Sequence, residues 1–368
     1  MFKLQKIQPY VVSIPLKSPI KMAGIVVETA DNLIVRAKDS DGNVGWGEAS
    51  SAPTMTGETP ESMLAAARFI APRIEGLEVE DLSHIHHQVD APMYGNHGAK
   101  AAIEIALLDI AGKRSGKPIY ELLGGARRGE ARILAMIAGG DLETEKANAR
   151  KLADAGFDAF KVKIGILGAD LDLERSAAAR SVLGEDMQIS ADANQGYTRD
   201  DALDFARGAR QAGLNFMEQL LPGSDIEGMA ACAEETDVPL GADEGIHSLN
   251  DLRIHKDAGA AKGASLKPIK LGGLFPVLEA ANWMNANGMH INLAGKVAES
   301  TIASAAVAHV ALALPQLDWD TSITHQYLAE DLTDDPLKIE NGVVRLDDRP
   351  GLGWEPSEER LQRYQILQ

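Results

Sequence analysis

The stretch Phe157-Asp158-Ala159-Phe160-Lys161-Val162-Lys163 is a short apolar run that ends on a lysine, and four similar runs follow it. They end at or just before Asp192, Glu218, Asp243 and Lys267, and successive positions lie 24 to 29 residues apart. A strand, a helix and two loops need about that length, so the five residues occupy equivalent places in successive β/α units. In a closed parallel barrel, strand ends in those places point into one mouth.

The chain from residue 131 onward alternates short apolar strands with amphipathic helices, a pattern typical of a parallel sheet. The first strand is expected near residues 133–138, the seventh at 289–293 and a short eighth near 316–319. The helices are expected at residues 143–155, 171–183, 199–212, 227–236, 249–258, 275–286 and 301–314. Eight strands predict a barrel of the TIM type.

The first third of the chain has a different pattern. Residues 7–15 and 32–37 read as strands, and Asp41-Gly42-Asn43-Val44-Gly45 has the turn chemistry of an antiparallel hairpin. Helical patterns follow at residues 60–74 and 99–114, and the tail contains one strand-like piece at 342–346. We therefore expect an α+β domain at residues 1–125, a barrel at 126–330, and a segment at 331–368 that returns to the first domain.

The composition argues against two classes of binding partner. A net charge of −18 argues against nucleic acid and anionic membranes, which would repel such a surface. The start of the chain has no apolar core typical of an export signal, and the single cysteine, Cys232, excludes an internal disulfide framework. One cysteine leaves the compartment undecided, and a cytoplasmic location with a reducing environment is the simplest prediction.

The three acids and two lysines suggest a specific chemistry. Asp192, Glu218 and Asp243 offer the oxygen ligands that Mg²⁺ prefers, with Mn²⁺ as a substitute. A cation held there could neutralise the enediolate that forms when a proton leaves the carbon next to a carboxylate. Lys163, with Lys161 two residues before it and a cation nearby, is expected to have a lowered pKa and to act as a base. Lys267, across the barrel, would meet the opposite face of the substrate.

Several motifs together resemble the enolase superfamily. They are Phe160-Lys161-Val162-Lys163-Ile164-Gly165, Ala191-Asp192-Ala193-Asn194, Met217-Glu218-Gln219, Ala242-Asp243-Glu244 and the run from Leu266-Lys267-Pro268 to Gly272-Gly273-Leu274. Within it the chain is similar to the muconate lactonizing enzyme subgroup of the mandelate racemase/muconate lactonizing enzyme family. The resemblance covers nearly the whole chain and implies a modified (β/α)7β barrel with an α+β capping domain formed by the N-terminal region and the C-terminal tail.

The resemblance also implies roles for individual residues. Asp192, Glu218 and Asp243 would bind Mg²⁺, and Lys163 and Lys267 would be the acid/base pair. Lys161 would touch the substrate carboxylate. Asn194 and Glu244 would support the metal site, and Glu299 would stand across it. Lys270 would be either a supporting or a surface residue. The family's barrels commonly form homo-oligomers, from dimers to octamers.

Substrate specificity is expected to come from the rest of the mouth. Met22, Thr54 and Thr56 lie in stretches that form a mobile lid in this family, although ordinary surface loops would look the same. Asp318-Trp319-Asp320 is expected at the eighth strand end, where a similar acid pair holds a substrate ammonium in the related dipeptide epimerases. Trp319 could then contact a methylated nitrogen, or the motif could simply pack a tryptophan.

The sequence thus predicts a Mg²⁺-dependent racemase or epimerase of an amino acid derivative, such as an N-acyl or N-methyl amino acid or a dipeptide. A muconate-type cycloisomerase or a hydroxyproline-type dehydratase could use the same residues. A barrel that only binds a ligand is the remaining alternative, and the intact acids and lysines argue against it.

Overall fold

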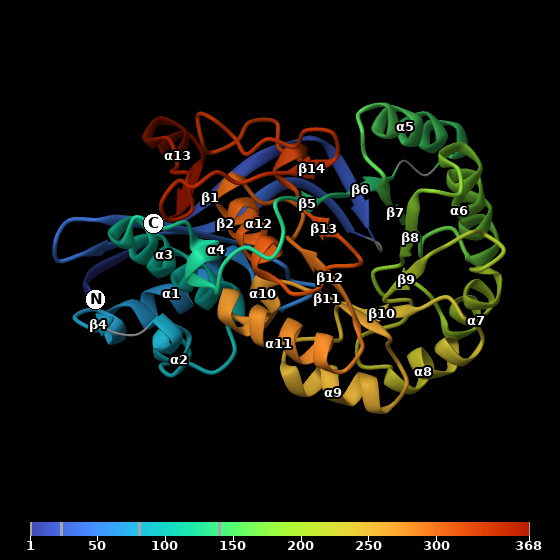
Figure 1. Ribbon diagram of the computed structural model, residues 1–368, viewed down its shortest axis with the longest axis horizontal. Helices are drawn as coiled ribbons and strands as arrows, with labels where there is room; N and C mark the ends of the chain where they lie inside the picture. The colour runs from blue at the N-terminus through green and yellow to red at the C-terminus, as the bar shows by residue number, and fades with distance from the viewer. Residues whose placement is uncertain (1, 23–24, 80–81, 139–140, 368) are drawn as a thin grey trace.

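A computed structural model of the protein describes residues 2–22, 25–79, 82–138 and 141–367. It shows a capping layer beside an eight-stranded barrel, with helices around the outside of the barrel (Figure 1). No helix within these ranges is long and apolar enough to span a membrane.

The barrel strands are parallel and run in chain order around the sheet. They are β6 (Leu134–Ile137), β7 (Ala159–Lys163), β8 (Gln188–Asp192), β9 (Phe216–Glu218), β10 (Leu240–Ala242), β11 (Gly263–Leu266), β12 (His290–Ala294) and β13 (Thr321–Ser322). A bridge between Ile133 and Thr321 joins the last strand to the first. The strands are almost wholly buried and most of their residues are apolar, as expected for a parallel sheet covered by helices.

A helix follows each of the first seven strands. These helices are α5 (Leu142–Asp154), α6 (Ala169–Leu183), α7 (Arg199–Gly208), α8 (Ile226–Glu234), α9 (Leu249–Asp257), α11 (Leu274–Ala286) and α12 (Thr301–Ala313), with the short α10 (Pro268–Leu271) before α11. The expected (β/α)7β barrel is confirmed. The expected eighth strand at residues 316–319 is displaced, because the paired residues are Thr321 and Ser322, opposite Leu293 and Ala294.

The capping domain is built on an antiparallel sheet. Its strands are β1 (Phe2–Met22), β2 (Ile25–Asp39), β3 (Val44–Ser50), the short β4 (Glu78–Val79) and, from the other end of the chain, β15 (Gln365–Leu367). Val11 pairs with Leu367, so the tail does return to the first sheet. The exact domain boundaries stay a prediction.

The remaining elements are short, apart from two long helices of the cap. They are α1 (Pro60–Ile74), α2 (Ile85–Asp90), α3 (His97–Ser115), α4 (Ile119–Leu122), α13 (Glu358–Tyr364), the 3-10 turns η1 (Leu82–His84) and η2 (His325–Tyr327), and the pair β5 (Ala131–Arg132) and β14 (Val343–Val344). Helix α3 packs directly on β3, where a Cβ at Gly47 would lie 1.9 Å from the carbonyl oxygen of Ala102. Glycine is therefore required at that contact.

Two buried carboxylates of the cap bind the amino ends of barrel helices. Glu48 of β3 accepts hydrogen bonds from the backbone N–H of Ser300 at 2.9 Å and of Ala303 at 3.0 Å, at the start of α12. Glu104 of α3 accepts from the N–H groups of Leu274 and Phe275, at the start of α11. Negative charge is favourable at these helix ends. The contacts hold the cap against the barrel.

Candidate active site

The carboxyl ends of the barrel strands and one loop of the cap enclose a cavity of about 330 Å³. Lys161, Lys163, Asp192, Glu218 and Lys267 all line it. The strand register explains why they meet, since Lys163 is paired with Asp192, and Asp192 with Glu218. Asp243 follows Ala242, the last residue of the next strand. The sequence therefore predicted the location of this cluster correctly.

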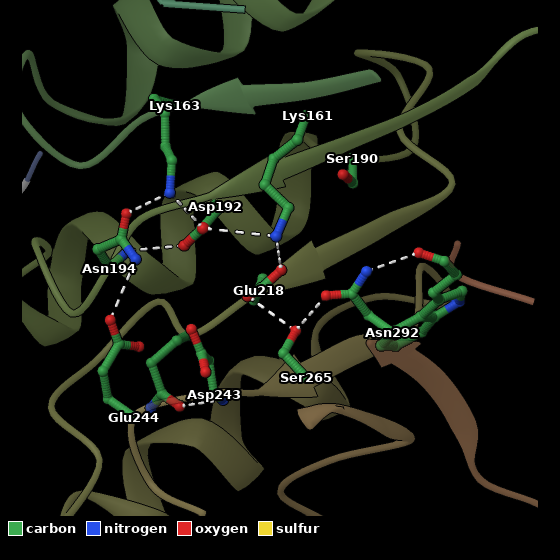
Figure 2. Close-up of polar contacts among 12 residues, drawn as sticks. Lys161, Lys163, Ser190, Asp192, Asn194, Glu218, Asp243, Glu244, Ser265 and Asn292 are labelled. Carbon is green, nitrogen blue, oxygen red and sulfur yellow. Dashed lines mark hydrogen bonds and ion pairs between the residues drawn. The ribbon is translucent and has the colours of Figure 1, made fainter. Parts of the chain in front are cut away.

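Each acid of the cluster accepts a hydrogen bond from a lysine of another strand end, and Figure 2 shows the contacts of Asp192 and Glu218. Lys163 Nζ donates to Asp192 Oδ2 at 2.6 Å, Lys161 Nζ donates to Glu218, and Lys267 Nζ donates to Asp243. Burial raises the pKa of Glu218, and the nearby charge of Asp192 raises it further. Burial would also raise the pKa of Asp243, but Lys267 and Lys270 hold it below its usual range.

Lys270 is a supporting residue and does not lie on the surface. Its side chain is fully buried, and Nζ donates to Asp243 Oδ1 at 2.6 Å and to the carbonyl oxygen of Ser265 at 2.9 Å. A buried ammonium of this kind is stable only with such partners. Lys270 therefore fixes the orientation of the Asp243 carboxylate.

Asn194 links Lys163 to Glu244. Asn194 accepts from Lys163 Nζ at 2.6 Å and donates to Glu244 Oε1 at 3.0 Å (Figure 2). Burial raises the pKa of Glu244 to about 7. Asn194 also has a φ of 42°, and Gln195 and Gln219 have φ values of 69° and 35°. Positive φ in non-glycine residues right after two metal-ligand candidates is typical of a functional site.

The donor set suits a hard divalent cation, although the acids are bound to lysines here. Within the described ranges, no group of three His, Cys, Asp or Glu side chains lies close enough together to hold a metal ion. The charges of these carboxylates repel one another, so the three acids would nevertheless gain from a shared cation. Asp192, Glu218 and Asp243 would hold it.

Of the specificity residues predicted in the two cap loops, only some line the cavity. Thr54 lines it, together with its neighbour Met55. Thr56 does not, because its hydroxyl is used inside its own turn, where it contacts the carbonyl oxygen of Ala52 and the N–H of Glu58. Met22 ends β1, but its side chain lies outside the described part of the structure.

Glu299 lies behind the cavity wall and does not face the substrate space. A Cβ at Gly295, a wall residue, would lie 2.1 Å from Glu299 Oε2. That oxygen is buried and has no hydrogen-bond partner within the described residues. Burial raises the pKa of Glu299 to about 8.

The prediction that Asp318, Trp319 and Asp320 contact the substrate is wrong. Asp318 Oδ1 accepts from the N–H of Ile291, and Asp320 Oδ1 accepts from Arg132 Nε at 2.7 Å, both at the amino ends of barrel strands. The Trp319 ring fills the bottom of the barrel, stacked on Phe216 at 4.2 Å between centroids. The motif precedes the eighth strand, so it lies at the opposite end from the cavity.

Sequence reasoning missed several residues of the site. Ser265 donates to Glu218 Oε1 at 2.9 Å and contacts Asn292, which extends a polar network from the metal-ligand candidates toward strand seven (Figure 2). Gln219 orders the next strand end by accepting from the N–H of Asp243. Lys296, just after β12, lines the cavity as a further lysine. Gln219 lies within one of the motifs quoted above and Ser265 directly before another, so both could have drawn attention, whereas Lys296 lies in none of them.

Comparison with known proteins agrees with this geometry. The model of the mandelate racemase/muconate lactonizing enzyme N-terminal domain matches residues 6–124. The enolase C-terminal domain-like model matches residues 144–360. The chain belongs to this family. Members of the family generally depend on a divalent metal ion, consistent with the cluster of Asp192, Glu218 and Asp243.

Three relatives illustrate the range of the family. The chain is 30% identical to the N-succinyl-L-Arg/Lys racemase of Bacillus cereus over 100% of this chain and 99% of the relative. It is 33% identical to the hydrophobic dipeptide epimerase of Citrifermentans bemidjiense over 96% and 98%. The muconate lactonizing enzyme of Pseudomonas fluorescens, solved with muconolactone, superposes with a TM-score of 0.94 at 30% identity, covering 99% of this chain and 100% of that one. The chain is therefore an enzyme, and these relatives are all isomerases.

Proposed function

We propose that the protein is a Mg²⁺-dependent racemase or epimerase that removes and returns the α-proton of an amino acid derivative, through an enediolate. One observation carries this proposal. Lys163 and Lys267 end or follow the second and sixth barrel strands, and the three carboxylates lie between them, at the carboxyl ends of strands three, four and five. A substrate carboxylate held on the acid side would present its α-carbon to one lysine on each face.

Some of these residues would bind the substrate and the metal ion, and others would transfer protons. Lys161, next to Glu218 and Asp192, would orient the substrate carboxylate. Mg²⁺ held by the three acids would stabilise the charge that develops on that carboxylate. One lysine, as a neutral amine, takes the α-proton, and the other, as an ammonium, delivers a proton to the opposite face. Inversion at the α-carbon follows.

The charged side chains that line the cavity favour a substrate whose nitrogen is uncharged. The acid pair expected to hold an ammonium lies at the other end of the barrel. The cavity wall presents lysines on several strands, and the acids that line it are engaged by lysine or asparagine. An N-acyl amino acid therefore fits better than a dipeptide with a free ammonium or a methylated cationic amine.

A cycloisomerase is the second candidate. The close superposition on a muconate lactonizing enzyme favours it. When one carboxylate of a muconate adds to its double bond, a C–O bond and an enolate form, and one lysine of the pair could deliver the proton that the α-carbon then takes up. A cycloisomerase could therefore use the same site for a different reaction.

Exchange in D₂O separates these functions. The protein with Mg²⁺ would be incubated with single enantiomers of N-acyl amino acids, with dipeptides, with hydroxyprolines and with muconate. Deuterium at Cα together with loss of optical rotation supports the proposal. Ring formation from muconate would establish the cycloisomerase, and loss of water from a hydroxyproline would establish a dehydratase.

A further inference from the structure

One arc of the cavity wall has no part in the chemistry described above. The metal-ligand candidates and the two catalytic lysines come from strands two to six. Strands seven, eight and one complete the ring, and they face whatever the substrate carries beyond its reacting carbon. Most of their cavity residues are apolar or carry hydroxyls, including Met136, Ala294, Ser322, Ile323 and Thr324.

Lys296 is the one charged side chain among the described residues on this arc. The three other lysines of the cavity each contact a carboxylate of the site. Lys296 forms no ion pair within the described residues, and its ammonium donates only to the adjacent carbonyl oxygen of Val297. It is half-buried, and burial beside Lys267 lowers its pKa to about 8. A cation in this setting lacks a strong partner.

The acids closest to Lys296 do not supply that partner. Glu299 lies on the far side of Gly295 and forms no ion pair with Lys296. Since burial raises the pKa of Glu299 to about 8, this side chain is mostly uncharged at neutral pH. Asp31 also acts on Lys296 electrostatically, but its Oδ1 accepts from Ser13 at 2.6 Å. The positive charge is thus left facing the cavity.

We propose that Lys296 binds a second anionic group of the substrate, a carboxylate on the acyl side of an N-acyl amino acid, and so selects dianionic substrates. This inference rests on the proposed function. The two anionic groups would occupy opposite sides of the cavity, one near the acids and Lys161, the other at Lys296. An acyl group of about four carbons that ends in a carboxylate, such as succinyl, has this chemistry. The second carboxylate of a muconate would offer the same group.

N-succinylglycine and N-butanoylglycine test the proposal directly. They have the same chain length and differ in the terminal carboxylate, and glycine derivatives undergo no net racemisation. Their binding would be measured by calorimetry with Mg²⁺ for the wild-type protein and for Lys296→Met. A charge-assisted contact is worth about a 10- to 100-fold preference for the succinyl ligand. We expect that preference in the wild-type protein and its loss in Lys296→Met, with butanoyl binding unchanged.

Two further variants control for the loss of a positive charge elsewhere and for a change of side chain that keeps the charge. Lys262→Met removes the same charge at the exposed amino end of β11, away from the cavity, and should keep the preference. Lys296→Arg should also keep it. The proposal is overturned if Lys296→Met retains the succinyl preference, if it weakens both ligands equally, or if the wild-type protein shows no preference.

Two further comparisons show which kind of molecule carries the second carboxylate, and whether the Lys296 subsite and the racemase proposal stand independently. Muconate compared with sorbate, its monocarboxylate counterpart, shows whether a muconate supplies the second carboxylate. If α-deuterium exchange fails for every N-acyl amino acid while Lys296 still governs the ligand preference, the racemase proposal falls and the Lys296 subsite stands. If exchange proceeds equally with succinyl and butanoyl substrates and Lys296→Met changes neither, only the subsite is disproved.

Discussion

Each acid of the active site lies beside a lysine, and this pairing sets its response to a bound cation. Asp243 contacts both Lys267 and Lys270, so its negative charge holds two ammonium groups in place. A divalent cation must compete with those ammonium groups for the carboxylate oxygens. The strength of metal binding therefore depends on the full negative charge of the cluster.

Asp243→Asn should weaken Mg²⁺ binding by at least about tenfold, because it removes one carboxylate and leaves two ammonium groups uncompensated. Calorimetric titration with Mg²⁺ measures the effect without any substrate. Asp318→Asn makes the same chemical change at the opposite end of the barrel and should leave affinity unchanged. Equal affinity in wild-type protein and Asp243→Asn would remove Asp243 from the ligand set.

Sequence spacing predicted that the three acids and the lysines Lys163 and Lys267 would meet in one cluster, but it did not predict the other residues that line the cavity. Strand ends recur with the β/α period, so Asp192, Glu218 and Lys267 could be placed from the chain alone. Lys296 follows a strand within a loop, where a lysine is usually exposed and without a specific role. Only the closed ring of strands shows that it faces a shared cavity.

At the level of secondary structure, the eighth strand shows how tertiary packing overrides a local pattern. Residues 316–319 contain Leu317 and Trp319 and read as a strand, but pairing begins at Thr321. Trp319 instead fills the space above Gly241 and Gly263, where a Cβ would lie 2.6 Å and 2.5 Å from its ring. Those two glycines lie 78 and 56 residues before Trp319, so no local signal connects them.

Trp319→Ala should lower the free energy of unfolding by about 3 to 5 kcal/mol, since it leaves a cavity under Phe216 at the bottom of the barrel. Chemical denaturation measures this loss. Trp319→Phe should recover part of the stability and keep the substrate preference of the wild-type protein. If Trp319→Phe changed the substrate preference, Trp319 would have to contact the substrate. That result would contradict its place at the bottom of the barrel.

For the whole molecule, the cap, the barrel and the C-terminal tail meet at a buried histidine. His309 of α12 is 1% exposed. Its Nδ1 accepts from the N–H of Tyr120 at 3.3 Å, and its Nε2 contacts the carbonyl oxygen of Leu352 at 3.1 Å. These partners require a neutral ring with the proton on Nε2. Burial lowers the pKa of His309 to about 4.

Acid should therefore loosen this junction. Between about pH 6.5 and pH 4 the ring is protonated in the unfolded chain but not in the folded one, so stability falls as pH falls through this range. The loss attributable to His309 is on the order of 3 kcal/mol at pH 4. Denaturation from pH 7 to pH 4 measures it, with His309→Gln for comparison, because glutamine can accept and donate at the same places. An equally steep decline in both proteins would contradict the assignment.

The homo-oligomeric state and the cytoplasmic location remain predictions at this scale. Light scattering of the purified protein would measure the first. Within one chain, Glu48 and Glu104 already bind the cap to the barrel helices.

The most direct test of the account follows α-deuterium exchange for each enantiomer of an accepted substrate in Lys163→Met and Lys267→Met. Each variant lacks the group that serves one face of the α-carbon, so racemisation should fall by about 10²- to 10⁴-fold in both. Lys262→Met, at the other end of the barrel, should exchange at the wild-type rate. Racemisation at the full rate in either catalytic-lysine variant would contradict the two-lysine mechanism.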